Sequence, residues 1–322
     1  MPVVDVDSLA ESTHLRIPVT LNIFLSLLSY AVAIGLLWCA SHTGSTLLLI
    51  VSAIGFSYVG NTIFSLLHES VHRNFHPIRK LNDAFGVVSA AFFPTGFTLQ
   101  RVCHLGHHRR NRTDLEMFDY YYPHENRFIK YYRLYCLLTG FYWLSVPFGC
   151  VVFFLFRGLF VSKIFRSVAQ PTGLVPMIEG LAEQPPGRIR LEIGFTILFQ
   201  ALLFWSLSLS LVGWLACYAA FALNWCSLQY TDHAWTARDI RHGAWNLKVN
   251  RAVQYVFLNY HHHLAHHQNP KVPWIHLAKF VDFDRPRPSF LRIYLSLWKG
   301  PRPIEQPPPG ALEPELERQL GT

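Results

Sequence analysis

The sequence predicts an all-α, polytopic membrane protein with about four transmembrane helices in two hairpins and a cytoplasmic, histidine-rich helical cap. Hydrophobic residues make up 51% of the 322 residues and charged residues only 15%, below the roughly 25% that is usual in soluble domains. Long uncharged runs alternate with short segments that carry the lysines and arginines, and three groups of closely spaced histidines lie near the ends of these runs. Together these observations predict apolar helices in a bilayer with a polar cap at one surface.

The first predicted hairpin comprises Ile17–Ala40 and Ser45–Leu67. Both runs are uncharged, and each exceeds the roughly 20 residues that a helix needs to cross a bilayer. The polar linker 41–44 is short, so the second helix returns the chain to its starting side. No cleavable signal peptide is expected, because the residues before the first run carry acidic groups in place of a cationic region.

Three further apolar runs follow. Ala84–Phe97 is too short for a span and contains a proline, which predicts an interfacial or re-entrant segment. Leu134–Phe156 is long enough to cross, and Pro147 is expected to kink it. Ile193–Gln229 is uncharged and fits either two tight spans, with a turn within Ser208–Gly213, or one very long helix.

If the histidine groups form one site, an even number of crossings must separate the second group from the third. Either the last run forms a hairpin and Leu134–Phe156 dips without crossing, or each run crosses once. The positive-inside rule favours the first alternative, because it keeps the cations between the two runs in the cytoplasm. These cations are Arg157, Lys163, Arg166, Arg188 and Arg190.

Cations also indicate the side on which the histidines lie. The two predicted outer turns hold no lysine or arginine. The segment after the first histidine group holds Arg73, Arg79, Lys80, Arg101, Arg109, Arg110, Arg112, Arg127, Lys130 and Arg133. The histidine side is therefore cytoplasmic. The net charge of +8 accompanies no nucleic-acid-binding motif, so we interpret it as charge that sets topology and contacts lipid headgroups.

The six cysteines include no Cys-x-x-Cys pair, and most lie in apolar segments. This predicts reduced packing residues, and neither a disulfide framework nor an iron–sulfur site. Cys103 directly precedes the second histidine group, so a ligand role is an alternative there. From Gly300 the chain is rich in proline, which predicts a disordered or extended tail over 300–322 after a membrane domain over 1–299.

The histidine groups read His68-Glu-Ser-Val-His72, His104-Leu-Gly-His107-His108 and His263-Leu-Ala-His266-His267. Residues three or four apart share one face of a helix, so each group can present two or three imidazoles to one point. Imidazole is a suitable ligand for iron, zinc, copper and nickel. The eight histidines exceed the four ligands of a structural zinc site and therefore predict two metal ions.

Two functions of other classes are alternatives. The first group also reads His-Glu-x-x-His, the signature of zinc proteases in which the glutamate is the general base. A membrane zinc metalloprotease would leave the other histidine groups unexplained. A metal transporter would need ligands along a path through the membrane, whereas these histidines lie at the ends of the runs and in polar connectors.

In order and spacing, the groups resemble the histidine boxes HxxxH, HxxHH and HxxHH of the membrane fatty acid desaturase and hydroxylase superfamily. The resemblance extends from about Asn61 to Leu277 and includes the stretch Asn269-Pro-Lys-Val-Pro-Trp274 after the third box. It implies a desaturase-like membrane domain with a non-haem site for two iron ions and one further histidine ligand, His233, after the last apolar run. The implied ligands are His68, His72, His104, His107, His108, His233, His263, His266 and His267.

The third box allows two registers. His261, His262 and His263 are consecutive, so His262 also stands four residues before His266. We prefer His263 because it restores the HxxHH pattern, and His262 is the substitute. His76, His124, His242 and His276 lack a paired spacing and are expected at the surface or around the ligands.

Side chains beside the boxes are candidates for supporting roles. Ligating histidines usually donate their other N–H to a carboxylate or carbonyl, and Glu69, Asp114 and Asp232 are close in sequence. The alternative is that these are ordinary solvated acids. Gln229 stands where the acyl-CoA desaturase branch of the family has an asparagine near one iron, and it has either a similar role or that of a solvated side chain.

The resemblance implies an O2-dependent oxidoreductase that removes hydrogen from an unactivated C–H bond of a lipid, with no catalytic residue beyond the metal ligands. A fatty acid or fatty acyl desaturase is the preferred interpretation. A lipid or carotenoid hydroxylase or ketolase, and a fatty acid decarboxylase that forms a terminal alkene, are the alternatives. Electrons must come from a separate donor of the ferredoxin, rubredoxin or cytochrome b5 type, because the chain has no Cys-x-x-Cys pair and no dinucleotide fingerprint.

Overall fold

Five helices are long and apolar enough to cross a membrane in the computed structural model, which describes residues 15–160, 162–169, 180–181 and 183–310. They are α2 (Val19–His42), α3 (Thr46–Val71), α7 (Phe141–Phe160), α10 (Pro186–Ser206) and α11 (Leu211–Thr231). The prediction of a helical membrane protein is thereby confirmed. The structure has five candidate spans where the sequence predicted about four, and the additional one is α7. The expectation about a signal peptide concerns residues outside the described part.

The side chains of α2 are distributed as in a helix that faces lipid. Most of its large apolar residues point outward, and Phe24, Leu27 and Trp38 are 59%, 57% and 52% exposed. The buried face, which packs against α3, carries Asn22, Ser26, Ser29, Tyr30, Ala33, Leu37 and Ala40. A helix of a soluble protein has the opposite distribution, whereas small and polar residues at the contact allow close packing of helices in lipid.

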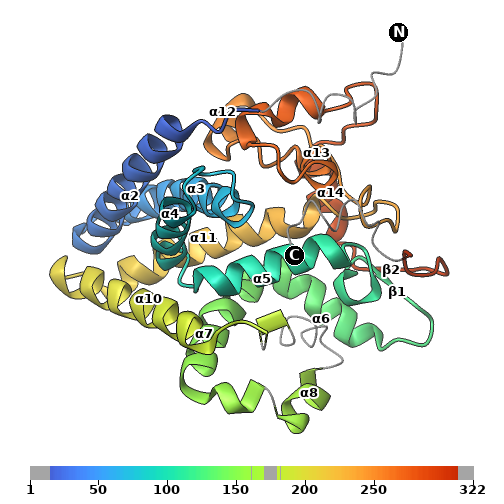
Figure 1. Cartoon of the computed structure of the whole chain (residues 1–322), viewed down its shortest axis with the longest axis horizontal. Coiled ribbons are helices and arrows are strands. Elements are labelled where there is room, and N and C mark those ends of the chain that lie inside the picture. The colour runs from blue at the N-terminus through green and yellow to red at the C-terminus, as the bar shows by residue number, and fades with distance from the viewer. Residues whose placement is uncertain (1–14, 161, 170–179, 182, 311–322) are drawn as a thin grey trace.

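The run Ile193–Gln229 forms two helices, α10 and α11, rather than one. The chain reverses at Ser208, which has a φ of +48°, and the side chain of Ser210 then caps α11 by accepting a hydrogen bond of 3.0 Å from the N–H of Gly213. A Cβ on Gly213 would lie 2.7 Å from the backbone of Ala40. The tips of the α2–α3 and α10–α11 hairpins therefore meet, at the left of Figure 1.

The run Leu134–Phe156 is divided between α6 (Arg127–Leu138) and α7. Gly140 separates them with a φ of +84°, and a Cβ there would lie 2.9 Å from the backbone nitrogen of Leu223 in α11. A glycine meets both conditions, because it has no Cβ. Pro147 lies within α7, but the backbone departs from helical geometry at Phe156.

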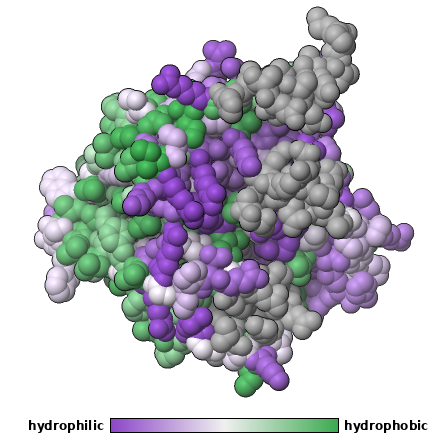
Figure 2. All heavy atoms as spheres, in the orientation of Figure 1, coloured by the Kyte–Doolittle hydropathy of each residue, from purple (hydrophilic) through white to green (hydrophobic). Residues whose placement is uncertain are grey.

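A cap lies at the end of the hairpins that is opposite their tips (Figure 1), and its helices are α5 (Phe97–Arg110), η1 (Asp114–Glu116), α12 (Arg251–Val256), α13 (His263–Gln268), η3 (Trp274–Phe280) and α14 (Phe290–Leu297). The other described helices are α4 (Arg79–Phe92) and α8 (Lys163–Ala169), and α8 contacts α7. The expected interfacial segment Ala84–Phe97 forms most of α4, which packs on α3 and α10. Figure 2 shows hydrophobic residues gathered on the left, over the hairpins, and hydrophilic residues across the centre and right.

The described part of the tail, up to residue 310, lies against the cap. β1 (Tyr120–Tyr121) pairs in parallel with β2 (Arg302–Pro303). The hydroxyl of Tyr122 donates a hydrogen bond of 3.0 Å to the carbonyl of Gln306, and the guanidinium of Arg302 lies 3.8 Å from the ring centre of Trp235. This part of the tail is therefore extended and held by several contacts.

Two cations that were expected at the cytoplasmic surface are buried. Arg112 is fully buried and donates a hydrogen bond of 2.8 Å to Asp119. Lys130 is also buried, 2.8 Å from Glu125. Both charges are paired, as buried charges must be, so they contribute little to the charge of the surface.

Candidate metal centre

Four segments bring histidines to one place at the cap ends of α3 and α11. His68 and His72 lie in the last turn and at the C-terminal cap of α3. α5 supplies the second box, and α13 supplies the third. His233 follows directly after the end of α11. The i, i+4 spacing places the histidines of each box on one helix face, as predicted.

Five of these histidines form the first group. They are His68, His72, His104, His108 and His266. The Nε2 atoms of His72 and His104 lie 2.8 Å apart, and that of His108 lies 3.1 Å from His104 and 3.0 Å from His266. Nε2 of His68 is buried and has no hydrogen-bond partner. All five rings therefore direct a nitrogen towards a common point.

The other four histidines form the second group. They are His107, His233, His263 and His267. Nε2 of His233 lies 3.1 Å from that of His107 and 3.0 Å from that of His263, and His263 lies 3.2 Å from His267. The structure thus brings all nine predicted ligands together, in one group of five and one group of four.

The two groups have the composition and arrangement that metal ions require. A neutral imidazole carries a single N–H, so the facing Nε2 atoms cannot all be paired by hydrogen bonds within a group. A cation at the centre of each group would instead meet every lone pair at once. Nitrogen ligands alone, with no thiolate or carboxylate, suit iron, zinc, copper or nickel. The residues therefore fit two metal ions of this kind.

Burial keeps these imidazoles in the form that binds a metal. Burial, reinforced by the neighbouring imidazoles, lowers the pKa of seven of them well below the ordinary value. These are His72, His104, His108, His233, His263, His266 and His267. A histidine must be neutral to offer a lone pair to a metal, so the low pKa favours binding.

In the group of four, the ring nitrogens that point away from the centre, Nδ1, lie close to backbone or carboxylate oxygens. In the group of four, Nδ1 of His233 donates to the carbonyl of Gly243 at 2.8 Å, and Nδ1 of His107 lies 2.5 Å from Oε2 of Glu116. Asp232 approaches Nδ1 of His263 at 3.5 Å. The two hydrogen bonds fix which nitrogen of His233 and of His107 faces the centre, whereas neither carboxylate oxygen of Asp232 has a hydrogen-bond partner.

The three predicted supporting carboxylates have separate roles. Asp232 is buried beside His263 and His233. Glu69 lies 3.9 Å from Nδ1 of His68, and its other oxygen accepts from the backbone N–H of Trp274 at 3.1 Å. Asp114 instead pairs with Arg238 at 2.6 Å. Glu116 was not among the carboxylates predicted from the sequence, where its only signal was its position shortly after the second box.

The structure distinguishes the consecutive histidines of the third box. His263 belongs to the group of four. His261 and His262 are buried elsewhere, with ring centres 4.0 Å apart, and neither belongs to a group of potential ligands. That His263 rather than His262 binds a metal ion stays a prediction. Its Nε2 atom lies beside those of His233 and His267, as a ligand of the group of four would.

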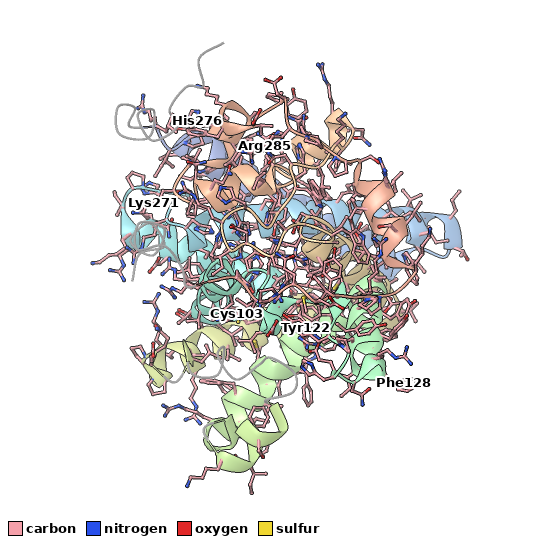
Figure 3. All side chains as sticks on the ribbon, turned by 90° about the vertical axis from the view of Figure 1, so that its right-hand side faces the viewer. Cys103, Tyr122, Phe128, Lys271, His276 and Arg285 are labelled. Atoms are coloured by element: carbon pink, nitrogen blue, oxygen red, sulfur yellow. The ribbon has the colours of Figure 1, made fainter. Side chains whose placement is uncertain are left out.

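Four other histidines, each without a paired spacing, lie outside both groups. His76 accepts a hydrogen bond of 2.9 Å from the N–H of Ile78, and His124 stacks on Tyr122. His242 is exposed beside Asp239. His276 donates to the carbonyl of Arg16 at 3.1 Å and lies at the edge of the face shown in Figure 3, far from Cys103. All four therefore have partners other than the nine histidines.

The cysteines do not take part in the two groups. All six are free, as the sequence predicts. Burial raises the pKa of the Cys103 thiol to about 12, whereas a metal ligand must be a thiolate. Cys103 therefore fits a packing role beside the second box.

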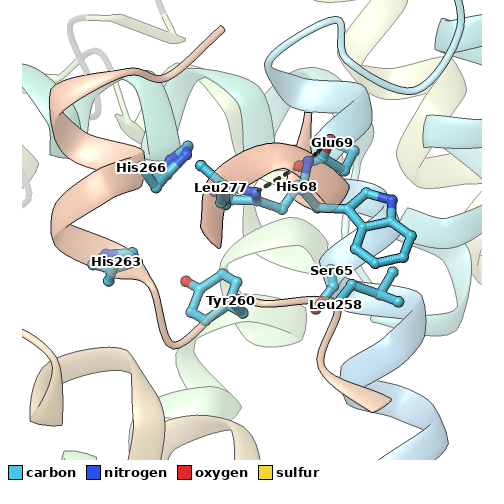
Figure 4. Close-up of a pocket in the computed structure, with 9 residues that line it drawn as sticks. Ser65, His68, Glu69, Leu258, Tyr260, His263, His266 and Leu277 are labelled. Carbon is cyan, nitrogen blue, oxygen red and sulfur yellow. Dashed lines mark hydrogen bonds and ion pairs between the residues drawn. The ribbon is translucent and has the colours of Figure 1, made fainter. Parts of the chain in front are cut away.

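A small pocket touches both groups of histidines. Figure 4 shows His263 and His266 of α13 on one side and Ser65, His68 and Glu69 of α3 on the other. The remaining lining residues are Leu258, Tyr260, Trp274 and Leu277. The side chain of Gln229 lies near the hydroxyl of Tyr260 and is half-buried, which places Gln229 beside the pocket rather than in bulk solvent.

Comparison with known proteins identifies the family. No curated protein matches the chain significantly. The model of the family described as fatty acid desaturase matches residues 21–298. The matched region contains all three boxes, His233 and the five long apolar helices except for the first residues of α2. Since this match covers most of the chain, the protein belongs to the membrane fatty acid desaturase and hydroxylase superfamily.

Proposed function

We propose that the chain is a membrane-bound, O2-dependent, non-haem di-iron oxidoreductase and, within that class, a fatty acid or fatty acyl desaturase. The observation that carries the proposal is the convergence of nine histidines into a group of five and a group of four. Two iron ions held there would supply the activation of O2 that removal of hydrogen from an unactivated C–H bond requires. Membership of the family supports a lipid as the substrate.

The chain's own residues would bind the ions, exclude water and orient the lipid. Eight of the nine histidines are buried, so the chemistry would be shielded from solvent. The pocket of Figure 4 places Leu258, Tyr260 and Leu277 beside histidines of both groups.

The alternative of a zinc protease is less well supported. In that mechanism the glutamate of His-Glu-x-x-His acts as general base on a metal-bound water. Here Glu69 accepts from the N–H of Trp274 and is buried. His68 and His72 also share their group with three further histidines, which leaves less room for water than a site with three protein ligands.

Product analysis tests the proposal. Cells that express the wild-type chain, the His266→Ala variant or the matched control His242→Ala would be compared by mass spectrometry of lipids and hydrocarbons. We expect an unsaturated product in the wild type and the control, and none in His266→Ala. A desaturase is ruled out if no unsaturated product depends on His266. A hydroxylated or ketonic lipid, or a terminal alkene, would identify one of the alternative reactions.

We also propose that α6 and α7 enter the membrane together without crossing it. α6 starts in the cap, where Lys130 contacts the carbonyl of Met117, and the turn at Gly140 lies against Leu223, part of the way along α11. α7 then returns, because Cys150 and Phe153 pack with Ile189 and Ile193 in the first turns of α10, and with Leu99 of α5. Four spans would remain, and the histidines would share the cytoplasmic side.

A separate electron donor is part of the proposal. Among the nine histidines, His107 is the one that is partly exposed, with 24% of its side chain accessible. Arg109 and Arg110 lie two and three residues after it and are also partly exposed. A donor protein with an acidic surface would be attracted to these cations and would bring its redox centre close to the group of four.

A further inference from the structure

Among the described residues, Glu116 is the carboxylate closest to the nine histidines. Its Oε2 lies 2.5 Å from Nδ1 of His107, and Nδ1 donates there because an ionised carboxylate only accepts. In the described part of the chain the next approaches are longer. Asp232 lies 3.5 Å from Nδ1 of His263, and Glu69 lies 3.9 Å from Nδ1 of His68. Glu116 is therefore the carboxylate with a short hydrogen bond to a candidate ligand.

The turn after α5 returns Glu116 to His107. Arg112 has a φ of +61°, and the N–H and hydroxyl of Thr113 both donate to the carbonyl of Arg110, at 2.9 and 2.7 Å. The chain thus reverses into η1. Arg133 of α6 donates to the carbonyl of Leu115 at 3.3 Å, which holds the backbone next to Glu116.

The second oxygen of Glu116 is held by Arg110. Nε and Nη2 of Arg110 lie 3.1 and 3.0 Å from Oε1. The guanidinium reaches this position by lying across Gly106, where a Cβ would be 2.6 Å from Nη1. Both oxygens of the carboxylate are thus fixed, and Oε2 remains directed at His107.

His107 needs such a partner more than the other eight histidines do. They are buried, and neighbouring side chains restrict their rings, whereas the side chain of His107 is 24% exposed. With the proton held on Nδ1, the lone pair of Nε2 faces Nε2 of His233 at 3.1 Å. Without Glu116, water competes for Nδ1, and the other ring orientation becomes accessible.

We propose that Glu116 is a positioning residue of the group of four: it fixes the ring orientation and tautomer of His107, so that one metal ion of the pair depends on a carboxylate and the other does not. The inference rests on the proposed function, since it assumes an ion in each group. The group of five has no comparable partner in the described residues, because Glu69 is shared with Trp274 and lies farther from His68.

Metal titration of the purified full-length chain in detergent tests this inference. Ferrous or cobaltous ion would be titrated anaerobically into metal-free wild type, Glu116→Leu, Glu116→Gln and Asp114→Asn. Asp114 lies on the same turn but pairs with Arg238, so Asp114→Asn is the matched control. Thermal unfolding of each variant checks the fold.

We expect Glu116→Leu to bind one ion with unchanged affinity and the other roughly 10–100-fold more weakly, as is usual when a ligating histidine loses its outer partner. Glu116→Gln should lose less, because the amide oxygen still accepts from Nδ1. Binding of both ions by Glu116→Leu as tightly as by Asp114→Asn would overturn the inference, and so would equal weakening of both. A wild-type chain that binds no ion would instead overturn the di-iron proposal itself.

Discussion

At the scale of single residues, the site depends on which ring nitrogen faces each centre. His262 and His263 are neighbours with the same side chain, yet only Nε2 of His263 lies within 3.0 Å of His233. His262 is the residue that precedes α13, and its ring packs on His261. A shift of one residue along the chain therefore separates a candidate ligand, His263, from a buried histidine that belongs to neither group.

We predict that His263→Ala and His262→Ala differ in metal content. His263→Ala removes a ligand from the group of four, so the affinity of that ion should fall by more than the roughly 10–100-fold that loss of an outer partner causes. His262→Ala should keep both ions. Elemental analysis of the two purified variants, beside the wild type, makes the comparison. Metal loss in His262→Ala with retention in His263→Ala would show that the register is wrong.

The sequence allowed prediction of the candidate ligands but only of some residues beside them: Asp232 and Glu69 lie near His263 and His68, whereas Glu116 was not predicted. The boxes are visible because a helix converts fixed spacing into a shared face. Glu116 reaches His107 through a turn in which Arg112 has a positive φ, and no periodicity reports such a turn. Asp114, closer to the box in sequence, points instead to Arg238. Sequence distance was therefore a poor guide to contacts outside a helix.

At the scale of secondary-structure elements, a buried polar cluster joins the segment after α5 to the end of α11. Asp119 is fully buried and lies 2.8 Å from Arg112 and 2.5 Å from the hydroxyl of Tyr230. It also accepts from the N–H of Trp235 at 2.6 Å. This cluster connects the segment that follows the second box to the segment that carries His233.

We predict that Asp119→Ala strongly destabilises the protein. The substitution leaves Arg112 as an uncompensated buried charge, which costs about 3–5 kcal/mol of the free energy of unfolding. The control is Asp282→Ala, because Asp282 is 54% exposed and pairs with Arg285 at the surface; its effect should stay below about 1 kcal/mol. Denaturant unfolding in detergent measures the free energy of unfolding of both variants. An equal loss of stability in Asp119→Ala and Asp282→Ala would contradict the role of the cluster.

Gly213 and Gly35 provide a second comparison between elements. A Cβ at Gly213 would lie 2.7 Å from backbone atoms of Ala40, whereas at Gly35 it would meet nothing within 4 Å. Gly213→Ala should therefore push the two hairpin tips apart and cost about 1–3 kcal/mol. Gly35→Ala should be neutral or stabilising by up to about 1 kcal/mol. The same unfolding assay decides, and a Gly213→Ala variant as stable as the wild type would exclude this close contact.

Element boundaries were predictable only where polarity changes. The linker 41–44 was apparent, and the structure indeed separates α2 from α3 there. The run Leu134–Phe156 offered no such break, since Gly140 lies among apolar residues and turns the chain only because it fits against Leu223. The burial of Arg112 could not be predicted from the sequence either, because composition does not show which charged side chains are paired.

At the scale of the whole molecule, the positions of the histidines constrain the topology. His107 of α5 and His233, which follows α11, belong to one group, so an even number of crossings separates these helices. In the proposed topology α10 and α11 each cross once, and α7 would make the number odd if it crossed as well. The positive-inside rule agrees with a dipping α7, because Arg157 and Lys163 then stay in the cytoplasm.

We predict that a reporter fused near residue 170 is cytoplasmic. Reporters placed between α2 and α3, and between α10 and α11, should lie on the opposite side of the membrane. Activity of alkaline phosphatase and fluorescence of green fluorescent protein at the three positions report the two sides. A reporter near residue 170 that is found outside the cytoplasm would show that α7 crosses.

The metal content of the purified wild-type chain tests the central claim most directly. We predict about two iron ions per chain, because nine converging histidines exceed what one ion can bind, and fewer in His266→Ala. The ions should be removable by a chelator and restored by ferrous ion with recovery of the lipid product. One zinc ion per chain, with no iron, would contradict the account.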